Sequence, residues 1–387
     1  MKADLVPLIV GGLVFLASLI SLKLGLSVAI VEVLVGAIAG NAGLQPETWM
    51  TYIAGFGGIL LTFLAGAEID TRLLREKSKE SFLIGILSFA LPFLGIFLYT
   101  RFVAGWSPKA ALIAGTALST TSLAVVYSVL VETGLAKTEI GKLIMASTFV
   151  TDMGTTLALS ILFVKPTLYT LIFISVSLNI IYFADKLSHR VFANPLLKNK
   201  VIEPEIKYVF LLLLAFMYFA NLGEGHAVLP AFLLGLIMSP HFKESSESHI
   251  VKHRLRTVSY AFITPLFFIV GGMKISFPLI LSALGLFAIL FGLKILLKFL
   301  GVFFLAKKYI PKGTVYTTLL MSTGLTFGTI SSLFGLNSGY ITQVQYSVLI
   351  GVVIASAVIP TFIAQRWFAP QHDEDIIDTN GGESRWR

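Results

Sequence analysis

A single carboxylate, that of Asp152, stands in the stretch 147–156, STFVTDMGTT, among apolar and hydroxyl side chains. Asp152 is the only charged residue between Lys142 and Lys165. An ionised carboxylate is costly in apolar surroundings unless a cation or a proton neutralises it. If a cation and a proton compete for this one group, the competition alone couples their movements. The alternative is a structural acid, hydrogen-bonded to neighbouring helices, but an acid inside an apolar span is a functional candidate by default.

The hydroxyl groups around Asp152 predict an all-oxygen cation site. In a helix, Thr148, Thr155 and Thr156 lie at positions i−4, i+3 and i+4 and share the face of Asp152, and Thr151 directly precedes it. Carboxylate and hydroxyl oxygens suit hard cations such as Na⁺ and K⁺, and no histidine lies mid-span to indicate a transition metal. We therefore expect Asp152 to bind Na⁺ or K⁺, and the sequence does not distinguish the two.

Three further charged residues, Lys298, Lys294 and Glu32, fall inside apolar stretches. Lys298 lies about 13 Å along a helix from the next basic residues, so it is expected to need a partner within the protein. Lys294 is one turn deeper, and the sequence leaves open which lysine faces the site. Glu68 and Asp70 lie near the end of an apolar stretch, where water or loop lysines can satisfy them, and we interpret them as structural.

Two runs of hydroxyl and glycine residues, GTALSTTSLAV at 115–125 and LLMSTGLTFGTISS at 319–332, are expected to interrupt helices. Ser, Thr and Gly offer competing backbone hydrogen bonds or lower helix propensity. Unwound backbone at membrane depth occurs only where it lines a cavity or is buried in protein. The alternative is that small residues simply allow close helix packing. The residues predicted to lie at these breaks and near Asp152 are Thr120, Thr121, Ser322 and Thr323.

The composition is that of a membrane protein with several spans. Hydrophobic residues make up 56% of the 387-residue chain and charged residues only 13%, whereas soluble domains carry about 25% charged residues. The mean hydropathy is +0.87. The absence of cysteine excludes disulfides, thiolate metal sites and thiol redox chemistry.

Thirteen apolar stretches are long enough to span a bilayer as helices. They are 5–22, 26–43, 50–69, 81–103, 108–131, 138–164, 167–185, 207–222, 226–240, 256–274, 277–306, 313–337 and 341–365. The first lacks the features of a cleaved signal peptide and is expected to be retained. With the N-terminus outside, most of the 29 basic residues fall in cytoplasmic segments, as the positive-inside rule requires. The tail 371–387 is then a short cytoplasmic segment.

Thirteen spans divide into six, one linker and six. Corresponding spans are then seven apart, so the second half inserts upside down relative to the first, the arrangement of an inverted-repeat transporter. The two hydroxyl-rich runs occupy corresponding spans, which favours a binding site between two broken helices at the membrane midplane. The predicted fold is all-α, with two six-span inverted repeats and two crossed broken helices.

Several motifs together resemble those of the monovalent cation:proton antiporter superfamily. LLTFLAGAEIDTRLL (60–74) resembles its F-L-A-G-x-E-I-D signature, and VEVLVGAIAGNAGL (31–44) resembles its glycine-spaced second span. The similarity continues around Asp152 and at LKFLGVFFLAKKY (297–309), and covers about residues 5–365. By this resemblance, Asp152 corresponds to the family's ion-binding aspartate and Lys298 to its core lysine.

The resemblance implies a division of labour between domains. It implies a transmembrane domain over residues 1–370, in which 81–164 and 277–365 form a core that moves like an elevator. The parts 1–69 and 207–274 would form a dimerisation scaffold, with 167–185 as a linking span.

This chain departs from its relatives at two places in the site. Electrogenic relatives have an acid directly before the aspartate, where this chain has Thr151. Many relatives have R-G-E in the second broken helix, where this chain has Ser322, Thr323, Gly324 and Leu325. Both changes remove charge, which leaves the stoichiometry and the choice of ion open. We expect electroneutral exchange, because one carboxylate swaps one cation for one proton while Lys298 stays protonated. The alternative is that burial disfavours the charged form of Lys298, so that it too exchanges a proton.

These features predict a secondary-active Na⁺ or K⁺/proton antiporter and not an enzyme, with no cofactor. A sodium-coupled solute symporter on the same fold is the main alternative, since fold alone does not decide function. An aspartyl protease would need two facing acids, and a primary pump would need a phosphate loop that the sequence lacks. The expected partners are the lipid bilayer of the cell membrane and a second copy of the chain, with no nucleic acid and no nucleotide.

Overall fold

The computed structural model describes residues 5–24, 27–68, 78–163, 168–193, 203–222, 227–240, 242 and 246–370. None of these residues forms a strand, so the predicted all-α fold class is confirmed for the described part. Within it, nine helices are long and apolar enough to cross a membrane, and three shorter apolar helices accompany them. The predicted tail 371–387, together with Asp70, lies outside the described residues.

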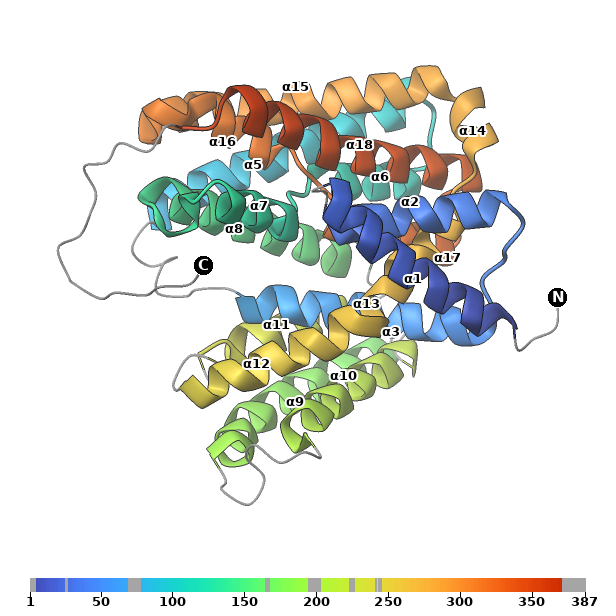
Figure 1. Cartoon of the computed structure of the whole chain (residues 1–387), viewed down its shortest axis with the longest axis vertical. Coiled ribbons are helices and arrows are strands. Elements are labelled where there is room, and N and C mark those ends of the chain that lie inside the picture. Colours follow the sequence, from blue (N-terminus) through green and yellow to red (C-terminus); the bar gives the residue numbers. More distant parts are fainter. Residues whose placement is uncertain are drawn as a thin grey trace.

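Figure 1 shows the helices in colours that follow the chain order. The first part of the chain forms α1 (Leu5–Leu24), α2 (Val28–Asn41), α3 (Thr48–Glu68), α5 (Ser78–Leu98), α6 (Pro108–Ser119), α7 (Leu123–Glu132) and α8 (Glu139–Leu162). The middle forms α9 (Leu168–Ala193), α10 (Pro204–Leu222), α11 (Val228–Met238), α12 (Ser246–Val258) and α13 (Thr264–Met273). The last part forms α14 (Phe277–Ser282), α15 (Leu284–Tyr309), α16 (Thr314–Met321), α17 (Thr326–Asn337) and α18 (Gln343–Trp367). Each predicted apolar range falls on one of these helices or on consecutive helices.

Both hydroxyl-rich runs interrupt a helix, as predicted. The first run lies between α6 and α7. Ser107 caps the start of α6, since its side chain accepts a hydrogen bond from the Ala110 amide. Pro108 occupies the first turn of α6, where no amide hydrogen is needed. The helix ends at Ser119, and Thr120 is extended with φ −65° and ψ 157°. The second pair breaks between Met321 and Thr326.

Two single turns of π-helix occur in the described chain. One, Tyr99–Val103, extends α5, and the other, Ser259–Ile263, joins α12 to α13. The range 256–274, expected as one span, is therefore a composite helix that starts earlier, at Ser246.

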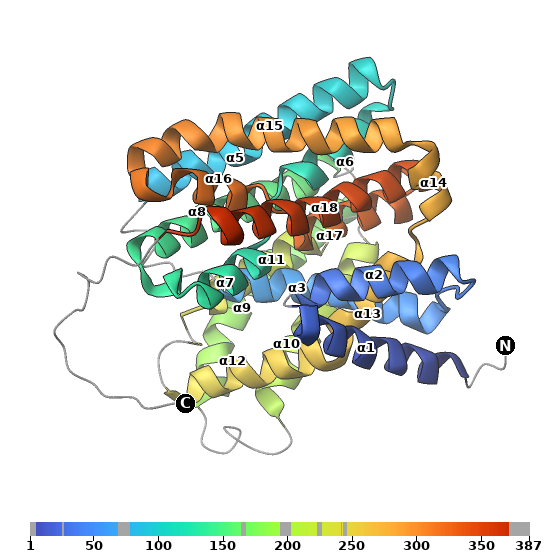
Figure 2. The same cartoon turned by 45° about the horizontal axis from the view of Figure 1, so that its top comes forward.

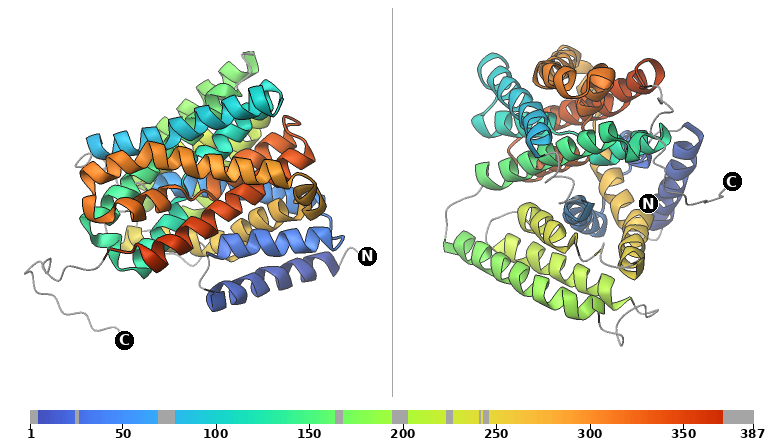
Figure 3. Two further views of the ribbon diagram at one scale, coloured as in Figure 1. Left: turned by 90° about the horizontal axis from the view of Figure 1, so that it is seen from above. Right: turned by 90° about the vertical axis from the view of Figure 1, so that its left-hand side faces the viewer.

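The helices form two groups. In Figure 1, α5 to α8 and α15 to α18 lie above α3 and α9 to α13, and Figure 2 shows α5 and α15 side by side at the top. Because α2 packs on α13 and α1 packs on α2, both belong to the lower group. The end-on view of Figure 3 separates the same two groups. The groups meet where α11 packs on α8 and where α13 packs on α17. The rings of Phe232 in α11 and Phe327 in α17 are also 6.4 Å apart, edge to face.

Glycines bring the backbones of two helix pairs of the lower group into direct contact. At the crossing of α2 with α13, a Cβ atom on Gly36 or on Gly272 would collide with a backbone carbonyl of the other helix. At the crossing of α3 with α11, Gly66 and Gly235 are in the same situation. Small residues at such crossings let helices pack backbone to backbone in membranes.

Candidate ion-binding site

The two helix breaks touch each other. The Ser122 amide donates a 3.2 Å hydrogen bond to the Thr323 carbonyl, and the Thr121 hydroxyl donates a 2.9 Å bond to the Met321 carbonyl. Since Met321 ends a helix, its carbonyl has no partner within that helix and needs one from elsewhere. The breaks predicted from sequence thus form one crossing, in which each satisfies backbone groups of the other.

Asp152 lies beside this crossing, inside α8. Its side chain is 2% exposed, and Oδ1 has no hydrogen-bond partner among the described residues. The Thr120 hydroxyl faces the carboxylate from the first break. Buried polar atoms are nearly always hydrogen-bonded, so the unpaired carboxylate oxygen makes Asp152 a candidate ion-binding group.

Two fully buried lysines of α15 approach the same crossing, and the structure distinguishes them. Lys298 interacts electrostatically with Asp152, and its Nζ donates hydrogen bonds of 2.9 Å to Ser88 and to Thr121. Lys294 Nζ instead donates a 2.8 Å bond to the Ser356 hydroxyl. Lys298 is therefore the lysine that faces Asp152, which the sequence left open.

The threonines of α8 donate their hydroxyl hydrogens within the helix. Thr148, Thr151, Thr155 and Thr156 each bond a carbonyl three or four residues earlier, at 2.7–2.9 Å. All four are buried. A hydroxyl that donates its hydrogen keeps its oxygen lone pairs, which are what a cation needs. The hydroxyls that share the face of Asp152 are thus poised as oxygen ligands.

Ser322 and Thr323 lie at the second break, as predicted, between the end of α16 and the start of α17. The hydroxyls of Ser322 and Thr323 bond the carbonyls of Thr318 and Leu320 in their own helix, both at 2.8 Å. In the described structure no hydrogen bond joins either hydroxyl to Asp152. The second break instead meets the first through backbone carbonyls.

Glu32, the remaining predicted candidate, belongs to the lower group of helices. It is 3% exposed in α2, and it acts electrostatically on Tyr260, in the π turn before α13. Glu68, interpreted from sequence as structural, pairs with Lys252 at 3.2 Å and with Arg256 at 3.4 Å. Neither acid has an interaction with Asp152 in the described structure.

Sequence reasoning missed two serines that hold the lysines, Ser88 in α5 and Ser356 in α18. Both are fully buried. Each is a lone hydroxyl in an apolar stretch, so a search for partners of the two intramembrane lysines could have found them.

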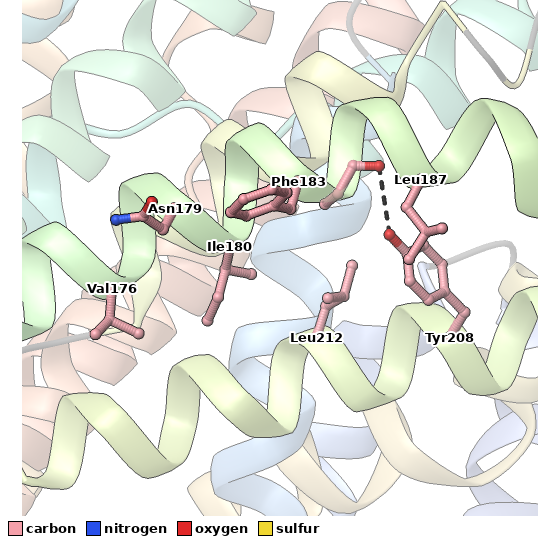
Figure 4. A pocket seen from close by; sticks show the side chains of 8 residues that line it. Val176, Asn179, Ile180, Phe183, Leu187, Tyr208 and Leu212 are labelled. Atoms are coloured by element: carbon pink, nitrogen blue, oxygen red, sulfur yellow. Dashed lines mark hydrogen bonds between the residues drawn. The ribbon is translucent and has the colours of Figure 1, made fainter.

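The structure also has an apolar cavity away from these charges. It has a volume of about 410 Å³ between α9 and α10 and is lined by residues such as Ile180, Phe183 and Leu212. Figure 4 shows these side chains, with the Tyr208 hydroxyl donating a 3.3 Å bond to the Ala184 carbonyl. Its lining carries no charged group, so it is unsuited to an ion.

Comparison with known proteins gives consistent similarities. The sequence model of the family described as sodium/hydrogen exchanger, transmembrane, matches residues 11–369. A probable Na(+)/H(+) antiporter 3 of Methanocaldococcus jannaschii is 26% identical over 88% of this chain and 90% of its own length. The Na(+)/H(+) antiporter of Enterococcus hirae is 26% identical over 90% of this chain and 93% of its own.

Two further comparisons extend the pattern. The Na(+)/H(+)-K(+) antiporter GerN of Bacillus cereus is 24% identical over 89% of this chain and 90% of its own length. The solved structure of the sodium proton antiporter MjNhaP1 from M. jannaschii superposes with a TM-score of 0.70 at 16% identity, covering 96% of this chain and all of that one. The fold is therefore the one found in that structure.

Proposed function

The chain belongs to the sodium/hydrogen exchanger family, and we propose that it exchanges Na⁺ for protons across a membrane at Asp152. The observation that carries this proposal is the buried Asp152 Oδ1, which lacks a hydrogen-bond partner among the described residues at the place where two broken helices cross. The family is one of membrane exchangers, not enzymes. The names of the relatives from M. jannaschii and E. hirae support the choice of Na⁺ and H⁺.

In the proposed mechanism, Na⁺ and a proton compete for the carboxylate of Asp152. The cation takes Oδ1 together with the lone pairs of hydroxyls on the same face and at the first break, such as Thr120. A buried carboxylate cannot carry its charge alone, so the carrier crosses the membrane with either a cation or a proton bound. Loading by one ligand expels the other, and this exclusion produces antiport.

Lys298 modulates the competition in this mechanism. Its ammonium interacts with the empty carboxylate but donates its hydrogen bonds to Ser88 and Thr121, so it can give way without losing those partners. An incoming Na⁺ therefore displaces an electrostatic partner and does not have to break a hydrogen-bonded ion pair.

The proposed inverted repeat, with thirteen membrane crossings, is supported by matching features at nearly constant sequence separations. Thr138 caps α8 and Thr342 caps α18, each accepting a bond from the amide three residues on, and the two lie 204 positions apart. The helices before the two breaks end at Ser119 and Met321, 202 positions apart. Caps and breaks in equivalent places are expected of duplicated units.

The glycine contacts fit the same repeat. Gly36 and Gly235 are 199 positions apart in α2 and α11, and Gly66 and Gly272 are 206 apart in α3 and α13. An inverted repeat exchanges the α2–α13 crossing with the α3–α11 crossing, and both have glycines at the equivalent positions. In our proposal, this backbone-packed lower group is the fixed scaffold, and the upper group is the moving core of an elevator.

The proposed domain organisation follows from this division. Residues 1–370 form the transmembrane domain, with a core of 81–164 and 277–365, a scaffold of 1–69 and 207–274, and a linking span at 167–185. We further propose a homodimer formed by the scaffolds in the cell membrane, with the N-terminus outside and a cytoplasmic tail, as the distribution of basic residues favours. The pH homeostasis of the cell would be its physiological output.

Transport is assayed with purified protein in liposomes that contain a pH-sensitive dye and an acidic interior. Addition of NaCl is expected to raise the internal pH, whereas choline chloride is not. KCl is tested in parallel because one relative is named as an antiporter that also handles K⁺. A requirement for an organic solute would instead identify a symporter, and no response to any chloride salt would contradict the proposal.

A further inference from the structure

Lys294 is a buried charge that the exchange mechanism does not use. Its side chain is fully buried, and its Nζ donates to the Ser356 hydroxyl at 2.8 Å, which passes its own hydrogen to the Val353 carbonyl at 2.8 Å. A Cβ atom on Gly324 would lie 2.5 Å from this Nζ and 3.1 Å from the Thr120 carbonyl. The Lys294 ammonium therefore packs against Gly324 in the second break, at the side that faces Thr120 of the first break.

The proposed repeat relates Ser356 to Asp152. The caps of α8 and α18 are 204 positions apart, and the same separation joins Asp152 to Ser356. The hydroxyl that holds Lys294 thus occupies, in the second repeat, the position that the ion-binding acid occupies in the first.

The repeat likewise relates Lys294 to Ser88. In the contact between α5 and α15, Gly95 packs on the Leu297 side chain, and Gly301 packs on the Leu87 carbonyl and more loosely on the Leu91 side chain. Relating Gly95 to Gly301, and Leu91 to Leu297, makes equivalent positions in this helix pair 206 apart. That separation joins Ser88 to Lys294. The positions of Ser88 and Asp152 in one repeat correspond to those of Lys294 and Ser356 in the other, and Lys298 links the first two through its bond to Ser88 and its electrostatic interaction with Asp152.

The chemistry of the two pairs is reversed. The first repeat has a short hydroxyl at one position and a carboxylate at the other, and Oδ1 of that carboxylate has no hydrogen-bond partner among the described residues. The second has an ammonium at the first position that donates to a hydroxyl at the second, so Nζ itself lies where the first repeat would hold a cation. An ammonium near the end of α16 also suits the partial negative charge of a helix C-terminus.

We propose that Lys294 is a tethered cation that permanently fills the second repeat's counterpart of the ion site, so that the carrier has a single exchangeable site at Asp152. The inference rests on the proposed function, because it takes Asp152 as the transported ion's site. Lys294 is a positioning residue: its ammonium fixes the second break against the first and does not leave with the cargo.

The experiment moves the first repeat's chemistry into the second. In an Asp152→Asn background, purified protein is tested for binding of radioactive Na⁺ and for a Na⁺-dependent rise in thermal unfolding temperature. Asp152→Asn alone is expected to lose both signals. Adding Lys294→Ser and Ser356→Asp is expected to restore both, because the new carboxylate is then without its tethered partner.

If the triple variant does not fold, the role of Lys294 is tested instead by comparing the stability of two Ser356→Asp variants, one with and one without Lys294. Ser356→Asp alone is expected to keep the parental unfolding temperature, because Lys294 neutralises the new carboxylate. Ser356→Asp with Lys294→Met is expected to lose several degrees, since a buried charge is left unpaired. Equal losses with and without Lys294, or a folded triple variant that binds no Na⁺, would overturn the tethered cation.

If the proposed function itself is wrong, the Na⁺-binding experiment gives a different result. Asp152→Asn alone would then still bind Na⁺, whatever residue occupies positions 294 and 356. The place of the ammonium is checked independently with Gly324→Ala, which should destabilise the protein less when Lys294 is replaced by Ala, since the closest colliding atom is then absent. The same loss in both backgrounds would place the ammonium elsewhere.

Discussion

The glycine crossings of the lower helix group and the crossing of the two breaks join helices by different means. At the α2–α13 and α3–α11 crossings, glycines bring backbone against backbone, with no side chain between. At the crossing of the two breaks, one backbone hydrogen bond joins Ser122 to Thr323, and the hydroxyl of Thr121 and the ammonium of Lys298 add side-chain hydrogen bonds. A backbone contact has one arrangement, whereas hydrogen-bonding side chains can exchange partners. The difference separates the part expected to stay rigid from the part expected to respond to an ion.

If only the crossing of the two breaks couples Na⁺ to protons, the largest effect on transport should come from a change at Asp152. Asp152→Asn should abolish Na⁺-driven proton movement in the liposome assay, because an amide cannot release a proton or carry the charge that binds Na⁺. Expression and thermal stability should be retained. Glu139→Gln, an exposed acid in the same helix, is the control and should leave transport intact. Proton-coupled transport by the Asp152→Asn variant would refute the assignment.

The next largest effect is expected at the glycine crossing of α3 with α11, in the region expected to stay rigid. Gly66→Ala should destabilise the protein by about 1–3 kcal/mol or more, the usual cost of overpacking, because the new Cβ meets the Phe232 carbonyl. Gly55→Ala in the same helix is the control, since its Cβ would meet only the Met217 side chain at 3.9 Å. Thermal unfolding in detergent measures both, and equal stability of the two variants would contradict a locked scaffold.

A smaller effect is expected from one hydroxyl at the crossing of the two breaks. Thr121→Val removes an acceptor from Lys298 and a donor from the Met321 carbonyl. Leaving such buried groups unpaired costs about 1–3 kcal/mol, so transport should fall by roughly tenfold or more. Thr62→Val is the matched change in α3, where the hydroxyl bonds only its own helix. If both changes have the same small effect, hydroxyl bonding does not distinguish the two regions.

The smallest expected signal is an absence of current. Because Thr151 replaces the acid of electrogenic relatives, one Na⁺ should exchange for one proton, and a Na⁺ gradient should drive no sustained current on a solid-supported membrane. Thr151→Asp adds a second acid next to Asp152 and is the comparison variant. Sustained current from the unaltered protein that disappears in Lys298→Gln would show that Lys298 also carries a proton.

The sequence predicted the helices and both breaks because each depends on local chemistry. Apolar length determines the helices, and the runs around Thr120 and Thr323 weaken helical hydrogen bonding wherever they are placed. The orientation of individual hydroxyls is different. Those of Ser322 and Thr323 turn back to carbonyls of their own helix, because a helix end supplies unpaired acceptors close by.

The partners of the two lysines required the three-dimensional crossing. Lys294 and Lys298 are one turn apart and chemically identical, so only packing against α5 and α18 assigns Ser88 to one and Ser356 to the other. Glu32 shows the same limit, since its burial was foreseeable but its electrostatic interaction with Tyr260, in the lower helix group, was not. Long-range pairing decides these contacts, and no local pattern encodes it.

The hydrogen bond from the Ser122 amide to the Thr323 carbonyl also bears on how the protein is made. Its two ends are 201 positions apart, about half of the 387-residue chain, so during synthesis the first break enters the membrane long before its partner exists. Thr121 and Ser88 are likewise synthesised well before Lys298, which donates hydrogen bonds to both in the folded protein. The ion site is therefore completed last, by the final helices to leave the ribosome, and a chain that stops before α15 contains Asp152 but none of the groups that the second half brings to it.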